Sequence, residues 1–386
     1  MIANISHSNS RLTNRRIASV QQEEHSLTVT WDDGSESLYH YIWLRDNCSS
    51  AFHSDTQERD FDLLSVSEDI HPLSVQIGEM SLDIIWSEGG HKSAFLWSWL
   101  HEHDYSRVDQ VRHISGYQSW DSSFLQSIPR AHYDAVISDD KALYQWMVAL
   151  DKLGLTIIEG MPDTTESTVS LATRIDYLRQ TNFGTTFDVV SVESPINLAY
   201  TSISLPLHTD LPNQETPPGY QFLHCLANEC EGGESTFVDG LRVAEELREQ
   251  CPDHFTLLSE QVIPFRYHDQ EQDIRQHHSV INVDDFGNIV EVKYNAHIAA
   301  VFDLPSDIMR DYYLAYRNLM ARFRDERFKI ELKLQAGQMV VFDNRRVLHG
   351  RNKFEDTSGR RHLHGCYVDR SEFKSRLRVL AQQHGS

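Results

Sequence analysis

The sequence predicts a mainly β protein with helical cover, in which a β-sandwich or jelly roll follows a small β-rich domain. Short β-rich runs alternate with helical segments through the later part of the chain, and this arrangement is typical of such folds. The earlier part carries two hairpin patterns of its own. At 386 residues the chain also exceeds the length that one hydrophobic core usually supports, so two domains are expected.

The composition describes an ordinary globular protein, with 40% hydrophobic and 24% charged residues. A formal net charge of −22 argues against nucleic acid and anionic membranes as partners, because both are bound through Lys and Arg. Neither a secretory signal in residues 1–20 nor an apolar stretch of membrane-spanning length is visible. An odd number of scattered cysteines predicts reduced thiols and a cytoplasmic location. These cysteines are Cys48, Cys225, Cys230, Cys251 and Cys366.

Two hairpins and a helix build the predicted small domain. Alternating apolar residues before the turn pair Asp33-Gly34 predict a hairpin over residues 26–43. Strands at 74–77 and 82–86 form a second pair, and the segment 94–103 is expected to be a short helix.

We place the small domain at 1–104, a polar linker of poor periodicity at 105–135 and the main domain at 136–386. In the main domain, Asp139 or Asp140 is expected to cap a helix that ends at Gly154, before a buried strand. The later predicted strands are 155–158, 220–226, 235–238 and 338–342, and the later predicted helices are 241–250 and 308–324.

Three side chains in the main domain match one metal-ligand pattern. His208 and Asp210 follow the apolar run 203–207, and residues two apart at a strand end point the same way. His349 ends a later apolar segment, after the predicted strand 338–342. Two imidazoles and one carboxylate leave open positions on a metal, which is the ligand set of non-haem Fe(II) oxygenases.

Arg361 follows shortly after His349, and its planar fork suits the far carboxylate of a 2-oxoglutarate that chelates the iron. Taken singly these signals are weak, because the chain has 21 histidines. His349 as a core histidine and Arg361 as a surface-pairing residue is the competing interpretation.

Several motifs together resemble the γ-butyrobetaine hydroxylase and trimethyllysine hydroxylase family of Fe(II)/2-oxoglutarate oxygenases. The likeness runs from about Ser26 to Leu380. The resemblance implies a double-stranded β-helix, a small N-terminal domain and a homodimer. The motifs are His208-Thr209-Asp210, Pro217-Pro218-Gly219, Gly232-Gly233-Glu234-Ser235, Phe342-Asp343-Asn344, Leu348-His349-Gly350 and Arg361-His362-Leu363.

The resemblance also assigns roles. It implies that His208, Asp210 and His349 bind iron and that Arg361, or its neighbour Arg360, binds 2-oxoglutarate. Ser235 or Thr236 is expected to add a hydroxyl to the cosubstrate. The implied reaction consumes O₂ and 2-oxoglutarate, releases succinate and CO₂, and hydroxylates an unactivated C–H bond, with the protein supplying geometry and exclusion of water.

For the substrate, the resemblance implies an aromatic cage around a trimethylammonium group, whose charge is attracted by ring faces. The matching residues are Phe183, Phe187, Tyr200 and Tyr367, where the two phenylalanines replace a Tyr and a Trp of animal relatives. Asp188 is expected to add a negative charge to the cage.

At the other end of the substrate, Asn197 matches the carboxylate-binding position, and Asn295 is the best second contact. γ-Butyrobetaine, hydroxylated to carnitine, is the leading substrate. Trimethylaminoethylphosphonate, which a histidine such as His297 would suit, and trimethyllysine are the alternatives. A non-catalytic betaine-binding protein is the alternative from another class, although pure binding needs neither the triad nor Arg361.

The small domain departs from the family pattern at its zinc site. The family uses three cysteines and a distant histidine, whereas here only Cys48 is cysteine. Ser50 and His53 stand at the other two cysteine positions, and His91 matches the histidine. A structural zinc ion requires four Cys or His ligands. Cys48, His53 and His91 supply three, so the sequence predicts either an incomplete zinc site or a metal-free domain that serves as a scaffold.

Overall fold

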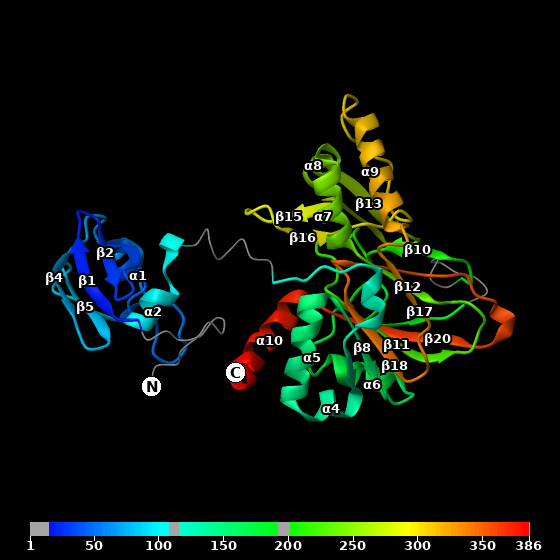
Figure 1. Ribbon diagram of the computed structural model, residues 1–386, viewed down its shortest axis with the longest axis horizontal. Helices are drawn as coiled ribbons and strands as arrows, with labels where there is room; N and C mark the ends of the chain where they lie inside the picture. The colour runs from blue at the N-terminus through cyan, green and yellow to red at the C-terminus, as the bar shows by residue number, and fades with distance from the viewer. Residues whose placement is uncertain (1–14, 108–115, 192–200, 386) are drawn as a thin grey trace. The chain divides into compact units, whose positions relative to one another are not determined.

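The computed structural model describes residues 15–107, 116–191 and 201–385. The chain divides into two compact units, 1–114 and 115–386 (Figure 1). No helix among the described residues is long and apolar enough to cross a membrane. All five cysteines lie in the described ranges and are free thiols, as the sequence predicts.

The first unit consists of two three-stranded antiparallel sheets, in the orders β1-β2-β3 and β4-β5-β6. Alternating residues such as Leu27, Val29 and Trp31 point into its core. Its strands are β1 (Ile17–Gln22), β2 (Ser26–Trp31), β3 (Glu36–His40), β4 (Pro72–Ile77), β5 (Ser81–Trp86) and β6 (Lys92–Leu96); its helices are α1 (Tyr41–Asp46) and α2 (Trp97–Glu102), with 3-10 turns η1 (Ser49–Ala51), η2 (Leu63–Ser65) and η3 (Tyr105–Arg107).

Two boundaries predicted in this unit are wrong. The second strand of the first hairpin stops at His40, because Tyr41 begins α1. The expected helix 94–103 begins only at Trp97, since Lys92–Leu96 is a strand in which Ser93 and Phe95 are buried alternately. A short apolar run fits both periodicities, which explains the second error.

The second unit is a jelly roll, as predicted, with helices on its outer faces (Figure 1). A six-stranded sheet, β7-β8-β18-β11-β20-β9, faces a four-stranded sheet, β10-β19-β12-β17. The strands are β7 (Arg130–His132), β8 (Leu155–Glu159), β9 (Thr186–Val189), β10 (Leu205–His208), β11 (Tyr220–Asn228), β12 (Ser235–Asp239), β17 (Lys329–Leu332), β18 (Gln338–Asp343), β19 (Val347–Arg351) and β20 (Arg361–Val368).

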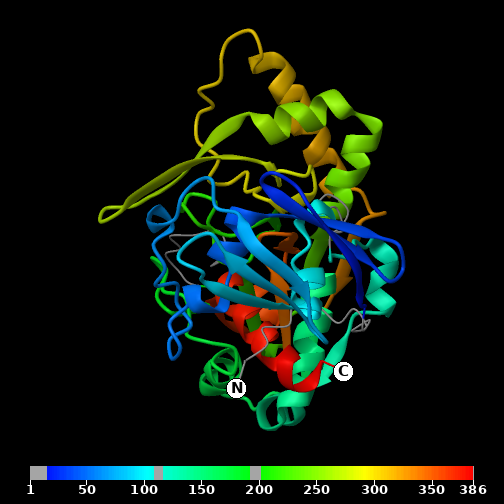
Figure 2. The same cartoon turned by 90° about the vertical axis from the view of Figure 1, so that its left-hand side faces the viewer.

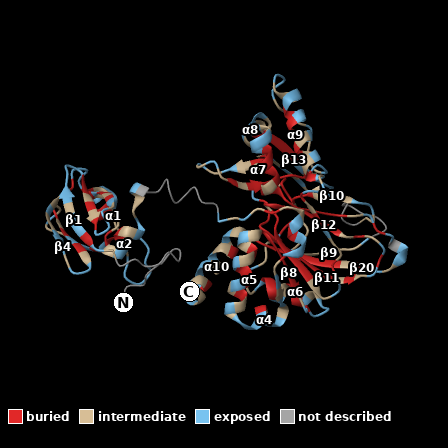
Figure 3. Ribbon diagram, viewed as in Figure 1, coloured by how far each residue is buried: buried red, intermediate tan, exposed pale blue. Residues whose placement is uncertain are grey.

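Side chains on the two faces of the six-stranded sheet serve different purposes. One face packs on the four-stranded sheet, where Leu223 and Phe342 share a core cluster with Phe237 of β12. The other face, with Phe222 and Val341, is covered by helices, so the central strands are buried throughout (Figure 3). The covering helices are α4 (Tyr133–Ser138), α5 (Asp140–Leu153), α6 (Thr165–Ala172) and α10 (Arg370–His384).

The predicted helix before β8 is confirmed at both ends. The Asp139 carboxylate accepts hydrogen bonds from the amides of Lys141 and Ala142. Gly154 ends α5 in the left-handed region, at φ 73°. The preceding segment, expected to be linker, forms η4 (Ser122–Gln126), β7 and α4, which are too short to show a period.

A largely helical segment joins β12 to β17 and lines part of the cavity described below. Its helices α7 and α8 precede the β13–β14 hairpin, which extends well away from them in Figure 2. Its elements are α7 (Gly240–Gln250), α8 (Pro252–Glu260), β13 (Val262–His268), β14 (Asp273–Ser279), β15 (Ile281–Val283), β16 (Ile289–Val292) and α9 (Met309–Phe323); η6 (Asp356–Ser358) lies after β19.

Candidate active site

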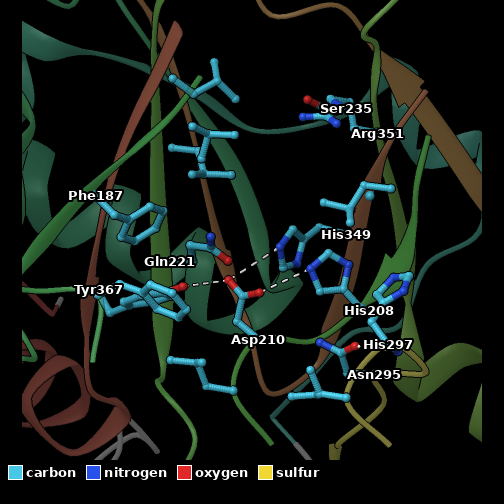
Figure 4. A pocket seen from close by; sticks show the side chains of 18 of the residues that line it. Phe187, His208, Asp210, Gln221, Ser235, Asn295, His297, His349, Arg351 and Tyr367 are labelled. Atoms are coloured by element: carbon cyan, nitrogen blue, oxygen red, sulfur yellow. Dashed lines mark hydrogen bonds and ion pairs between the residues drawn. The ribbon is translucent and has the colours of Figure 1, made fainter. Parts of the chain in front are cut away.

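The three residues of the predicted metal site converge in the jelly roll. His208 ends β10, and His349 lies directly opposite it on the antiparallel neighbour β19. His208 Nε2 lies 3.2 Å from Asp210 Oδ1, and His349 Nε2 lies 3.6 Å from Asp210 Oδ2 (Figure 4). One ligand atom from each residue falls within 4.8 Å of the others, and no other such cluster of three occurs among the described residues.

Asp210 differs from the two histidines because it lies beyond the end of its strand. The next residue, Leu211, has a φ of 57°, which is uncommon for a residue with a side chain. Burial alone would raise the pKa of the Asp210 carboxyl, but His349, His208 and the Tyr367 hydroxyl outweigh it, so the pKa is lower than usual. The carboxylate is therefore charged.

The surroundings of the two histidines suit metal binding. His208 Nδ1 lies 2.8 Å from the Pro206 carbonyl, and donation there would leave Nε2 free to face the cluster. Burial, with a smaller effect of His208, lowers the pKa of His349 to about 3 despite the opposing charge of Asp210. Two imidazoles and a carboxylate fit a divalent metal with open positions.

A cavity of about 290 Å³ opens on this cluster. Arg361 lines it, is 8% exposed, and makes no side-chain hydrogen bond or ion pair with any described residue. Its guanidinium lies 5.4 Å from the Phe354 ring, and burial lowers its pKa. Arg360, the alternative, is exposed outside the cavity and contacts His362.

Strand alternation separates the two predicted hydroxyls. Ser235 lines the cavity, whereas Thr236, the next residue of β12, does not. Arg351 pairs across the sheet with Ser235 and is a second cavity-lining arginine that sequence reasoning missed. Backbone carbonyls of Thr201 and Ile203 accept hydrogen bonds from Arg351.

Aromatic rings line another part of the cavity. Phe187 and Tyr367 lie with ring centroids 5.1 Å apart, and Phe183 meets Tyr267 edge to face at 5.6 Å. Three of these four were predicted. Tyr267 was missed because it comes from the distant hairpin strand β13, and no local pattern links it to the others.

Asp188 does not line the cavity, and its predicted place beside the cage is wrong. Because β9 alternates, Phe187 and Val189 face the cavity while Asp188 faces away. Its carboxylate lies 2.7 Å from His362 Nε2 and 2.9 Å from His364 Nδ1.

Neutral amides make up much of the remaining polar lining. Asn295 donates to the Thr209 carbonyl at 3.3 Å, and His297 beside it also lines the cavity. Asn213 and Gln221 were missed by sequence reasoning. Both amide atoms of Asn213, and Gln221 Oε1, are buried without a hydrogen-bond partner among the described residues. The predicted contacts Asn197 and Tyr200 lie outside the described residues.

The predicted zinc residues are only partly brought together. Cys48 Sγ lies 3.3 Å from Ser50 Oγ and 3.7 Å from His91 Nε2. His53 instead accepts backbone hydrogen bonds within its own loop through Nδ1. These residues offer one thiol and one imidazole, fewer than the four ligands of a structural zinc site.

Two family models match the chain. The model "Gamma-butyrobetaine hydroxylase-like, N-terminal" matches residues 18–101, and "Taurine catabolism dioxygenase TauD, TfdA family" matches residues 116–367.

Curated relatives are similar along nearly the whole chain. A gamma-butyrobetaine dioxygenase of Pseudomonas sp. (strain AK-1) is 40% identical over 94% of this chain and 96% of its own. The human gamma-butyrobetaine dioxygenase is 30% identical over 93% of this chain and 95% of its own. The mitochondrial trimethyllysine dioxygenase of Rattus norvegicus is 30% identical over 92% of this chain and 88% of its own.

Proposed function

The chain belongs to the family of Fe(II)/2-oxoglutarate-dependent dioxygenases that includes these relatives, and we propose that it hydroxylates a small trimethylammonium carboxylate, γ-butyrobetaine first among them. In this proposal His208, Asp210 and His349 hold the iron, and Arg361 binds the far carboxylate of 2-oxoglutarate. With both bound, the metal and cosubstrate supply the oxidising chemistry. The residues of this chain bind, orient and shield the reactants.

One observation carries the proposal: a buried guanidinium without a hydrogen-bond or ion-pair partner among the described residues shares a cavity with the His-Asp-His cluster. A buried charge is costly unless it is paired. Arg361 therefore needs an anion from outside the chain, and the forked guanidinium suits a carboxylate. Ser235 and Arg351 line the same cavity and would add polar contacts.

The aromatic wall supports a quaternary ammonium group as the cationic end of the substrate. Phe183, Phe187, Tyr267 and Tyr367 present ring faces and edges to the cavity, and ring faces attract a cation that cannot donate hydrogen bonds. Phenyl rings give a weaker attraction than indole, so four rings compensate for the absence of tryptophan from the described wall.

The charges of the cavity favour a carboxylate over a phosphonate. Among the described lining residues the fixed positive charges are Arg351 and Arg361, which both lie against Phe354. Burial lowers the pKa of His297, with His208 adding to the effect, so this histidine is neutral. Residues 192–200 contain no Lys, Arg or His. Hydrogen bonds from neutral amides are sufficient to bind the single negative charge of a carboxylate. A phosphonate, which carries nearly two negative charges, would need cationic side chains.

Succinate formation and O₂ consumption, measured side by side with three substrates, test the proposal. γ-Butyrobetaine should give the highest coupled turnover, trimethylaminoethylphosphonate much less, and trimethyllysine the least because the cavity is small. Phe187→Leu should weaken the binding of γ-butyrobetaine more than the binding of its primary-amine analogue. Faster turnover of the phosphonate would overturn the carboxylate assignment. Equal losses of affinity for γ-butyrobetaine and for its primary-amine analogue would overturn the proposed role of the aromatic wall.

Three further expectations stay predictions. Light scattering tests the homodimer, and cell fractionation tests the cytoplasmic location. Metal analysis of the Asp210→Ala protein tests the zinc site, because that variant removes the competing iron site. The paired thiol and imidazole of Cys48 and His91 lead us to expect little bound zinc.

A further inference from the structure

Asp210 is the ligand with the weakest anchorage from its own strand, since β10 ends two residues earlier and Leu211 adopts a positive φ. Two side chains from other elements contact it: Asn344, from the turn between β18 and β19, and Tyr367 of β20, which is seen in Figure 4. We propose that Asn344 and Tyr367 are positioning residues that fix Asp210 for metal binding. This inference rests on the proposed iron site.

Asn344 holds the main chain of Asp210. Its Oδ1 accepts a hydrogen bond from the Asp210 amide at 2.6 Å, and its Nδ2 donates to the Asp210 carbonyl at 3.1 Å. The same Nδ2 donates to the Pro218 carbonyl at 3.1 Å, so the fully buried amide is satisfied. Only an amide side chain of this length offers an acceptor and a donor to the two sides of one peptide residue.

The turn that carries Asn344 is itself rigidly held. Asp343 forms a buried ion pair with Arg370, at 2.7 Å, and Arg346 forms another with Asp239, also at 2.7 Å. The backbone N–H of Asn344 donates a hydrogen bond to the Gly219 carbonyl at 2.9 Å. Because charges flank it on both sides, this turn gives Asn344 a fixed position from which to act.

Tyr367 holds the carboxylate. Its hydroxyl donates to Asp210 Oδ2 at 2.6 Å, a charge-assisted bond of short length. One carboxylate oxygen is thereby engaged, so Asp210 would offer its other oxygen to a metal. The Tyr367 ring also lies next to the Phe187 ring, so Tyr367 links the aromatic wall to the proposed metal ligand.

Binding of Mn(II) to the metal-free full-length protein, followed by electron paramagnetic resonance without turnover, tests both residues. Tyr367→Phe keeps the ring but removes the hydroxyl, and should weaken Mn(II) binding by about 10- to 100-fold, the usual effect of losing an outer-shell partner. Tyr220→Phe is the matched control, because this buried hydroxyl lies 3.3 Å from Asp151 instead.

Asn344→Asp replaces the donor with an acceptor facing two carbonyls, and should weaken Mn(II) binding to a similar degree. Asn318→Asp is its control: this half-buried asparagine of α9 contacts His254 and lies outside the cavity lining. If Asn344→Asp does not fold, Asn344→Ala takes its place, with circular dichroism as the check on folding.

The outcomes separate the two levels of the proposal. Wild-type Mn(II) affinity in both Tyr367→Phe and the folded Asn344 variant would overturn this inference, as would an equal loss in the control variants. Asp210→Ala must lose Mn(II) binding in any case. If it does not, the proposed iron site itself is wrong, whatever Tyr367 and Asn344 do.

Discussion

Arg361→Met should raise the thermal stability of the protein while it weakens binding of 2-oxoglutarate. The substitution keeps the length of the side chain and removes its charge. Arg361 is 8% exposed and has no hydrogen-bond or ion-pair partner among the described residues, so in the absence of cosubstrate it is an unpaired buried cation. The charge that binds 2-oxoglutarate therefore destabilises the fold, so its removal should increase stability and decrease affinity for the cosubstrate.

Both magnitudes follow from the geometry. Two charge-assisted hydrogen bonds to a carboxylate are worth about 1.5–3 kcal/mol each. Their loss corresponds to an increase of about 10²- to 10⁴-fold in the dissociation constant of 2-oxoglutarate. Leaving a buried donor unsatisfied costs about 1–3 kcal/mol. Relief of that cost should raise the Tm of the second unit by about 2–6 °C, at about 2 °C per kcal/mol for a unit of its size.

Differential scanning calorimetry with and without 2-oxoglutarate measures both effects. Arg360→Met is the matched control, since Arg360 is the exposed neighbour outside the cavity and should change neither quantity. A lower Tm for Arg361→Met without cosubstrate would refute the unpaired-cation argument. An unchanged 2-oxoglutarate affinity would refute the assigned role of Arg361.

Three other substitutions probe the second unit. Burial, and then the nearby His364, lower the pKa of His224 to about 4, so the unfolded chain takes up a proton that the folded chain refuses. The free energy of unfolding should therefore decrease as the pH falls from about 6.5 to about 4. In His224→Leu this decrease, measured by urea unfolding, should be smaller by up to about 3 kcal/mol; an unchanged dependence of the unfolding free energy on pH would contradict this prediction. Gly365→Ala would place a Cβ 2.6 Å from Phe187 Cζ, so KM for the substrate should rise while the 2-oxoglutarate requirement stays; unchanged KM would show that the ring is not seated there. Asp210→Ala should keep its circular dichroism spectrum and abolish succinate formation, and normal turnover would disprove the ligand assignment.

Much of the second unit could be predicted because its signals are local. Asp139 and Gly154 mark the ends of one helix through capping chemistry alone. The apolar run before His208 predicts a strand that ends near this residue, and β10 does end at His208. The direct pairing of β10 with β19 is not a local property, since it depends on closure of the jelly roll. Spacing alone therefore left His349 open to interpretation as a core histidine.

The residues that sequence reasoning missed share a different feature. Tyr267 reaches the cavity from a hairpin between the helices, and Asn344 contacts a residue 134 positions away. The motif around Asn344 was visible, but an amide near a strand end is ordinarily interpreted as turn chemistry. Only the paired strands show that its amide faces Asp210.

Asp188 illustrates how a one-residue error in register changes a functional assignment. Neighbours on a strand face opposite sides, so a cage that uses Phe187 cannot also use Asp188 without breaking β9. The carboxylate instead joins the edge strand to β20 through His362 and His364. Asp210 is therefore the only carboxylate among the described residues that line the cavity, and the aromatic wall itself contains none. A trimethylammonium group suits such a wall better than a primary ammonium, which would leave its hydrogen-bond donors unpaired there.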